Sequence, residues 1–199
     1  NLPEKDEREA VETITELIEY YKGIFTILSL CAARQLEEVT FRRNTIPVQE
    51  LFDAAGKYFR KVMKNRTEKV ELIIEPMEAR VIGDMNQLRF LFENLIDEAL
   101  AVREEGVIRL QARKDNEYIR FLFTDTRREK SVTELNQLFY PNLARMTSGE
   151  KGELRGTEYL ICKQIIRDHD EFAGRRGCRI NAEPAEGGGF TVYFTIPRR

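Results

Sequence analysis

The sequence has no excess of basic residues, no long apolar run and few cysteines, and each absence excludes a class of protein. Its 199 residues include 32 Lys and Arg against 34 Asp and Glu, and this net charge of −2 argues against a general nucleic-acid binder. The longest mainly apolar run, residues 24–33, is too short to span a bilayer. Three widely spaced cysteines without a CxxC pair predict a reduced compartment and no zinc site.

The chain also lacks a secretory signal and an initiating Met. We therefore expect a fragment of a longer chain that makes no membrane contact itself. It would be a cytoplasmic protein or the cytoplasmic part of a membrane-anchored one. The length suffices for one sizeable core with an appendage.

The first segment, residues 4–38, is predicted to be one long helix. Its apolar residues recur at alternating spacings of three and four, and a second apolar line repeats every seven residues beside them. The stripe is wider than a two-stranded coiled coil needs. It is typical of a four-helix bundle or of a helix that packs onto its own domain, and both alternatives stay open. The two lines comprise Val11, Ile14, Ile18, Tyr21, Phe25, Leu28 and Ala32, and Ala10, Leu17, Ile24 and Cys31.

The remainder alternates between short strand-like and helix-like segments. Helices are predicted from Thr45, with Pro47 in the first turn, to about residue 62, from Asp84 to about 103, near 133–139 and over 157–168. The polar stretch 125–155 is too long for a plain connection and predicts a functional or mobile loop. The order indicates an α+β fold, a two-layer sandwich of a mixed sheet with helices on one face. Strands are predicted at 39–43, 69–74, 80–82, 107–113, 118–124, 178–183 and 190–196.

Five segments resemble, in the same order, the signature segments of the ATP-binding domain of bacterial sensor histidine kinases. They are residues 82–100, 121–126, 138–141, 161–169 and 179–197. The resemblance covers about four-fifths of the chain. It implies the Bergerat ATP-binding fold over residues 39–199, with 1–38 as a helix of the dimerisation-bundle type. It also implies ATP and Mg²⁺ as cofactors.

The resemblance assigns the adenine-binding role to one carboxylate. Asp125 stands where the family's aspartate accepts a hydrogen bond from the adenine amino group, and Thr126 follows it as in the family. A carboxylate suits this task because it accepts hydrogen bonds and offers no competing donor. The alternative is that Asp125 only caps a turn after its strand.

The family's metal-binding position is changed. The second Asn of the family's "NLlxNA" motif reaches the Mg²⁺, and here that position is Glu98, with Asn94 one turn earlier. Glu98 is a competent Mg²⁺ ligand, but it adds negative charge beside a triphosphate. Asn94 stands where the ATP-hydrolysing branch has its general base, and an amide cannot act as a base. The alternative is a polar Glu98 at a cavity edge or paired with an Arg.

The glycine-rich loops depart furthest from the family. The "DtGxG" box ends here in Arg127-Arg128-Glu129, and of "GtGLGLa" only Gly156 and Thr157 match. Glycines serve there because backbone amides must approach phosphate oxygens, so Glu158 and Tyr159 should crowd that approach. Nearby cations could hold phosphate or an acidic partner instead, or simply be solvated. They are Arg127, Arg128, Lys130, Lys151 and Arg155.

The chain has a single histidine, His169, at the family's structural "HgG" position, and none in the first helix. The fragment therefore carries no phosphate-accepting His, and whether it is an enzyme stays open. We expect a degenerate histidine kinase-like ATP-binding domain of a two-component-type signalling protein, with weak or absent nucleotide binding and a scaffold or docking role. The alternative is a divergent but active catalytic domain. Expected partners are a second copy, through the first helix, and a response-regulator-like receiver.

Overall fold

The computed structural model describes residues 7–15, 17–18, 21, 25, 41–140 and 157–199. Contacts divide the chain into two units, one of residues 1–40 and 141–157 and one of residues 41–140 and 158–199. In the first unit residues 7–15 are helical, which confirms that part of the predicted long helix, and the rest of 4–38 lies mostly outside the described residues. Among the residues described, no helix is long and apolar enough to cross a membrane.

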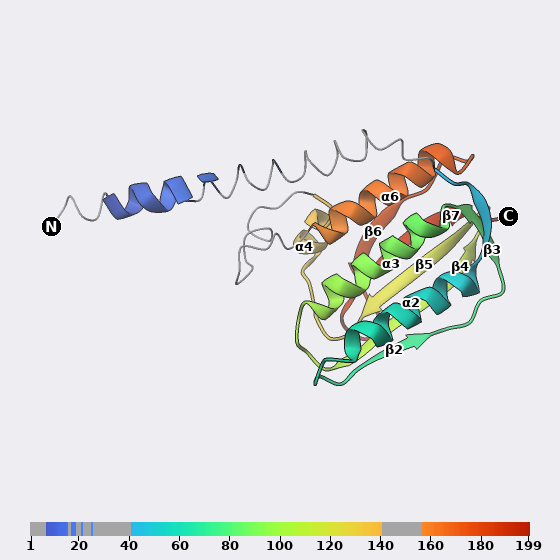
Figure 1. The fold of residues 1–199 in the computed structure, drawn as a ribbon, viewed down its shortest axis with the longest axis horizontal. Coiled ribbons are helices and arrows are strands. Elements are labelled where there is room, and N and C mark those ends of the chain that lie inside the picture. The colour runs from blue at the N-terminus through green and yellow to red at the C-terminus, as the bar shows by residue number, and fades with distance from the viewer. Residues whose placement is uncertain (1–6, 16, 19–20, 22–24, 26–40, 141–156) are drawn as a thin grey trace. The chain divides into compact units, whose positions relative to one another are not determined.

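The second unit is a sheet with helices on one face (Figure 1). The five-stranded sheet has the order β2-β4-β5-β7-β6, in which β2 and β4 are parallel and the other neighbours antiparallel. Strands β1 and β3 form a separate antiparallel pair. The strands are β1 (Asn44–Pro47), β2 (Val70–Ile74), β3 (Arg80–Gly83), β4 (Gly106–Asp115), β5 (Tyr118–Asp125), β6 (Ile180–Pro184) and β7 (Phe190–Pro197).

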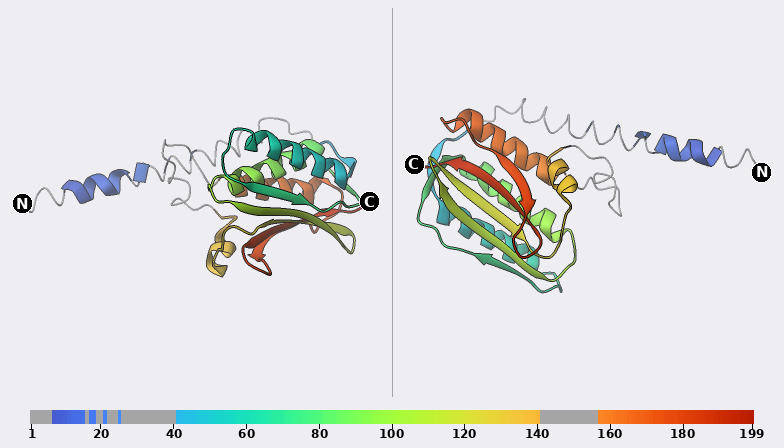
Figure 2. Two further views of the ribbon diagram at one scale, coloured as in Figure 1. Left: turned by 90° about the horizontal axis from the view of Figure 1, so that it is seen from below. Right: turned by 180° about the vertical axis from the view of Figure 1, so that it is seen from behind.

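Helices α2, α3 and α6 lie side by side over the sheet, and Figure 2 shows that they occupy the same face. The predicted two-layer α+β sandwich with a mixed sheet is therefore confirmed. The helices are α2 (Val48–Met63), α3 (Met85–Leu100), the short α4 (Val132–Gln137) and α6 (Glu158–Phe172).

The core forms where the helices meet the sheet, because the central strands alternate. In β5, Ile119, Phe121 and Phe123 are buried against the helices, while the residues between them are half-buried. Phe121 stacks on Phe194 of β7 with ring centroids 5.0 Å apart. This period of two is typical of a strand with one face on a core.

The start of α3 is fixed from three directions at Asp84. One carboxylate oxygen accepts from the Gln87 amide at 3.0 Å, which confirms Asp84 as the N-cap. The other accepts from the Arg42 amide at 2.8 Å. The Asp84 amide itself donates to His169 Nε2 at 3.1 Å.

The predicted entry into the domain is wrong by several residues. Among the described residues the first strand is Asn44–Pro47, and residues 41–43 of the predicted strand are not in one; residues 39–40 lie outside the described part. The register of β1 is set by pairing with β3, with Thr45 opposite Ile82. Thr45 is therefore a strand residue and not a helix cap. Pro47 takes the N-cap position of α2, and its side chain makes no capping hydrogen bond.

Candidate functional site

Asp125 is the last residue of β5 and lies at one end of the sheet. It pairs with Ile108 of β4 on one side and with Phe190 of β7 on the other, so its side chain is 1% exposed. Its backbone carbonyl also packs tightly against Gly189, where an added Cβ would lie 2.1 Å from the Asp125 oxygen. The strand end is thus held rigidly, and the carboxylate is a buried charge that needs partners.

The partners are two arginines that follow it directly in the chain. Oδ1 accepts from the Arg127 amide at 3.0 Å and from Arg127 Nε at 2.9 Å. Oδ2 accepts from Arg127 Nη2 at 2.9 Å and from Arg128 Nε at 3.2 Å. An ionised carboxylate has about four lone-pair sites, two on each oxygen. These four bonds use all of them.

Arg127 is held as closely as the carboxylate that it pairs with. Its guanidinium also donates to the carbonyl of Ala99 at 2.6 Å and to that of Glu104 at 2.9 Å, and its side chain is 1% exposed. Ala99 belongs to the last turn of α3, where helix carbonyls lack partners and favour a cation. Gly106, with φ of 137°, makes room for the arginine stem, since a Cβ there would lie 2.8 Å from Arg127 Cγ.

Arg128 joins the site from the other side. Its side chain is 13% exposed, its Nη2 reaches the Glu98 carbonyl at 3.5 Å, and its guanidinium carbon lies 5.8 Å from the centre of the Phe190 ring. Lys130 approaches the same ring at 5.5 Å. Arg127 and Arg128 are therefore bound within the domain and are not simply solvated. That they hold phosphate or an acidic partner stays a prediction. Lys151 and Arg155 lie outside the described residues.

The other predicted site residues lie on three elements. Thr126 is exposed, and its hydroxyl donates to the Val107 carbonyl at 2.7 Å. Asn94 is buried on α3, where its amide donates to the Phe90 carbonyl of the same helix at 2.8 Å. Thr157 immediately precedes α6 and is half-buried. Gly156 lies outside the described residues.

Glu98 lies on α3 one turn after Asn94 and is half-buried. Its charge, after burial itself, is a main cause that raises the pKa of the Tyr159 phenol well above its ordinary value. A Mg²⁺ held by one carboxylate and phosphate oxygens would need no further protein ligand, so Glu98 as a metal ligand stays a prediction. In the described part of the chain, no three His, Cys, Asp or Glu side chains are grouped to hold a metal ion.

Tyr159 fills space at the first turn of α6, where the family's loop carries glycines. Its side chain is 3% exposed, and its ring meets Phe139 edge to face with centroids 5.7 Å apart. The sequence predicted that Tyr159 would crowd the phosphate approach, but it did not identify Phe139 as the ring that packs against it. An aromatic residue at a glycine position needs apolar contacts when it is buried, so a packing partner for Tyr159 could have been expected from the sequence.

His169 has a structural place, as the sequence indicated. It is fully buried near the end of α6, with Nδ1 2.8 Å from the Ile165 carbonyl and Nε2 accepting from the Asp84 amide. Burial lowers its pKa, although the Asp84 and Asp168 carboxylates oppose that shift. A neutral ring that donates from Nδ1 and accepts at Nε2 satisfies both contacts.

As the side chains lie, Asp125 offers no free acceptor site for the adenine that the resemblance assigns to it. The adenine amino group would need an acceptor site on Asp125, and Arg127 and Arg128 use all four. Tyr159, which the resemblance places where backbone amides should meet phosphate, is buried. Binding would first have to displace a buried, bidentate arginine.

The fold and this site define an α+β domain of the Bergerat type. The chain belongs to the family described as "Histidine kinase-, DNA gyrase B-, and HSP90-like ATPase", whose model matches residues 83–199. It carries a histidine kinase-like ATPase domain of the kind found in two-component sensor kinases.

Individual relatives agree with this family. The signal transduction histidine-protein kinase BaeS of Escherichia coli K12 is 24% identical over 163 residues, which are 80% of this chain and 33% of BaeS. The chain thus spans about a third of that relative. The mycobacterial sensor histidine kinase MprB has a similar structure, with a TM-score of 0.58, 17% identity and coverage of 79% of this chain and 99% of the other.

Histidine kinase ThkA, solved in complex with the response regulator protein TrrA, gives a TM-score of 0.62 at 19% identity. That match covers 94% of this chain and 52% of the other. At such identities the structural likeness shows the fold alone.

Proposed function

We propose that this chain is a degenerate histidine kinase-like module of a two-component-type signalling protein, in which nucleotide binding is weak or lost and the fold serves as a scaffold that docks a partner. The observation that carries the proposal is the saturation of Asp125 by Arg127 and Arg128. The fold is retained although the charge of Asp125 is neutralised within the domain. We therefore infer that the role of the domain does not depend on ATP binding.

In this proposal residues 1–38 form a dimerisation helix and residues 39–199 the ATPase-like domain. The described part of the helix supports a self-association role, because its large apolar side chains are exposed. A receiver-like protein is the proposed partner, by analogy with the ThkA complex. Sedimentation of the chain over a range of concentrations tests the first point, and a monomer throughout would contradict it. The exposed side chains are Val11, Ile14, Leu17, Ile18, Tyr21 and Phe25.

Calorimetric titration with Mg-ATP tests the loss of nucleotide binding. We expect the wild-type chain to bind more weakly than about 1 mM. Arg127→Gly restores the family's glycine and removes two of the four bonds to Asp125, so we expect it to bind Mg-ATP at least about tenfold more tightly. Arg128→Ala removes a single bond and serves as the matched control, with a smaller gain.

Two outcomes would contradict the proposal in different ways. Micromolar binding by the wild-type chain would show that the site still works, and would favour the divergent but active catalytic domain. Equal affinities of the wild type and a folded Arg127→Gly variant would show that Arg127 is not the group that blocks the site.

A further inference from the structure

A second feature lies away from Asp125, where several chain segments bring six exposed arginines together. We call this surface the arginine end. Arg199 donates its amide to the Arg80 carbonyl at 3.1 Å. Arg198 donates its amide to the Glu117 carbonyl at 2.8 Å, and Arg175 pairs with the Glu117 carboxylate at 3.0 Å. The arginine end consists of Arg43, Arg80, Arg175, Arg176, Arg198 and Arg199.

The loop between α6 and β6 links Arg43 and Arg176 to this surface. An added Cβ on Gly174 would lie 2.7 Å from the guanidinium of Arg43, so that guanidinium packs directly on the loop. Arg176 of the same loop pairs with Asp170 at 3.2 Å. The surface is therefore continuous from the start of the domain through this loop to residue 199.

The charge of the arginine end is only partly balanced. Glu117 and Asp170 pair with Arg175 and Arg176. Within residues 41–140 and 157–199, no ion pair is recorded for the other four arginines of this surface. Glu78, two residues before Arg80 in the chain, adds a third carboxylate, so six arginines against three acids leave a surplus of three positive charges at one end of a chain whose net charge is −2. Such a local field attracts a partner of opposite charge.

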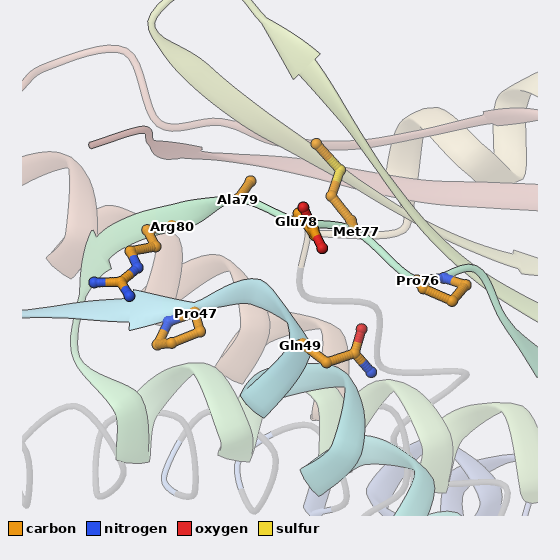
Figure 3. A pocket seen from close by; sticks show the side chains of 7 residues that line it. All are labelled: Pro47, Gln49, Pro76, Met77, Glu78, Ala79 and Arg80. Atoms are coloured by element: carbon orange, nitrogen blue, oxygen red, sulfur yellow. The ribbon is translucent and has the colours of Figure 1, made fainter.

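An open groove of about 580 Å³ borders the arginine end, and Arg80 belongs to both. Figure 3 shows Pro47 and Gln49 at the start of α2 on one side, with the extended segment from Pro76 to Arg80 on the other. The lining is mixed: Pro47 and Pro76 are apolar, and Gln49, Arg80 and the acidic Glu78 are polar. Arg199 reaches Thr45 of the adjoining β1 at 3.5 Å, so a second arginine lies by the groove.

We propose that the groove and the arginine end together form a docking site for an acidic peptide segment of a partner protein. An aliphatic side chain of the peptide would enter the groove, and neighbouring carboxylates would pair with Arg80 and Arg199. Arginine forms bidentate pairs with carboxylates, which gives position as well as charge. The groove favours a peptide over a nucleic-acid backbone, which has charge but no aliphatic group to fill it. This proposal rests on the docking role proposed above and assigns that role to a particular surface. It does not require the domain to bind ATP.

Fluorescence anisotropy with a labelled peptide of alternating glutamate and leucine tests the site on the whole chain. We expect Arg80→Glu with Arg199→Glu to weaken binding at least about tenfold, because two attractions become repulsions. Arg109→Glu changes one charge on an exposed arginine of β4 outside the arginine end and should weaken binding less than about twofold. Gln49→Trp, at an exposed position that lines the groove, adds a bulky side chain without changing charge, and should weaken binding at least about fivefold.

Gln49→Glu places a negative charge at the same groove position, and should also weaken binding because it repels the carboxylates of the peptide. The proposal is overturned if the peptide does not bind, if Arg109→Glu matches the effect of the double variant, or if both groove variants bind like the wild type. Stronger binding of single-stranded RNA or of anionic vesicles than of the peptide would also overturn it. None of these measurements uses Mg-ATP, so failure here leaves the result of the Mg-ATP titration independent.

Discussion

Replacing Arg127 with methionine is expected to lower the free energy of unfolding by about 3–5 kcal/mol, because it leaves a buried carboxylate short of charge-balancing partners. Arg127 supplies two side-chain bonds to Asp125 and two to the carbonyls of Ala99 and Glu104. The side chains of Arg127 and Asp125 are each 1% exposed, so water cannot replace these bonds. Urea unfolding, followed by circular dichroism, measures the loss.

The matched control is an arginine on the surface. Arg103 pairs with Glu68 at 3.0 Å, but its side chain is 76% exposed, so Arg103→Met should cost less than about 1 kcal/mol. The double variant Arg127→Met with Asp125→Leu removes both charges and should recover part of the loss. An Arg127→Met variant no less stable than Arg103→Met would contradict the buried network.

Gly189→Ala is expected to destabilise the domain by about 2–4 kcal/mol, from a strained backbone and a direct clash. Gly189 has φ of 82°, and its Cβ would lie 2.1 Å from the Asp125 carbonyl oxygen and 2.7 Å from Thr126 Cα. These are backbone atoms at the end of β5 and the turn after it, so they cannot move without shifting Asp125 itself.

Gly187→Ala separates the two causes. Gly187 has a similar φ of 87°, but an added Cβ would meet nothing within 4 Å. Its replacement should therefore cost only the backbone term, about 1–2 kcal/mol. Chemical unfolding of both variants measures the difference, and equal losses would mean that the contact at Asp125 contributes nothing.

Much of the fold could be predicted from sequence because it depends on local patterns. The strand at β5 and the cap at Asp84 depend on patterns among neighbouring residues, and both are present in the structure. The first strand was misplaced because the register of β1 comes from β3, far along the chain. Thr45, for example, pairs with Ile82, which is 37 residues away.

The candidate site was predictable in its position but not in its contacts. The resemblance placed Asp125 at a strand end, where it is found. Arg127 turns back onto Asp125 because the fold provides two acceptors and a space for it. The acceptors are the carbonyls of Ala99 and Glu104, and the space lies beside Gly106. A single sequence shows the loss of a glycine at position 127, but not which group takes the space.

Nuclear magnetic resonance of the arginine Nε–H groups tests the central claim most directly, because it observes the bond to Asp125 itself. In a ¹⁵N-labelled chain, the Arg127 signal is assigned by its absence from the Arg127→Met spectrum. We predict a signal that exchanges slowly with water and does not change when Mg-ATP is added to millimolar concentration. A signal that shifts in a saturable way, or exchanges rapidly once Mg-ATP is present, would show that nucleotide displaces Arg127 and would contradict the claim.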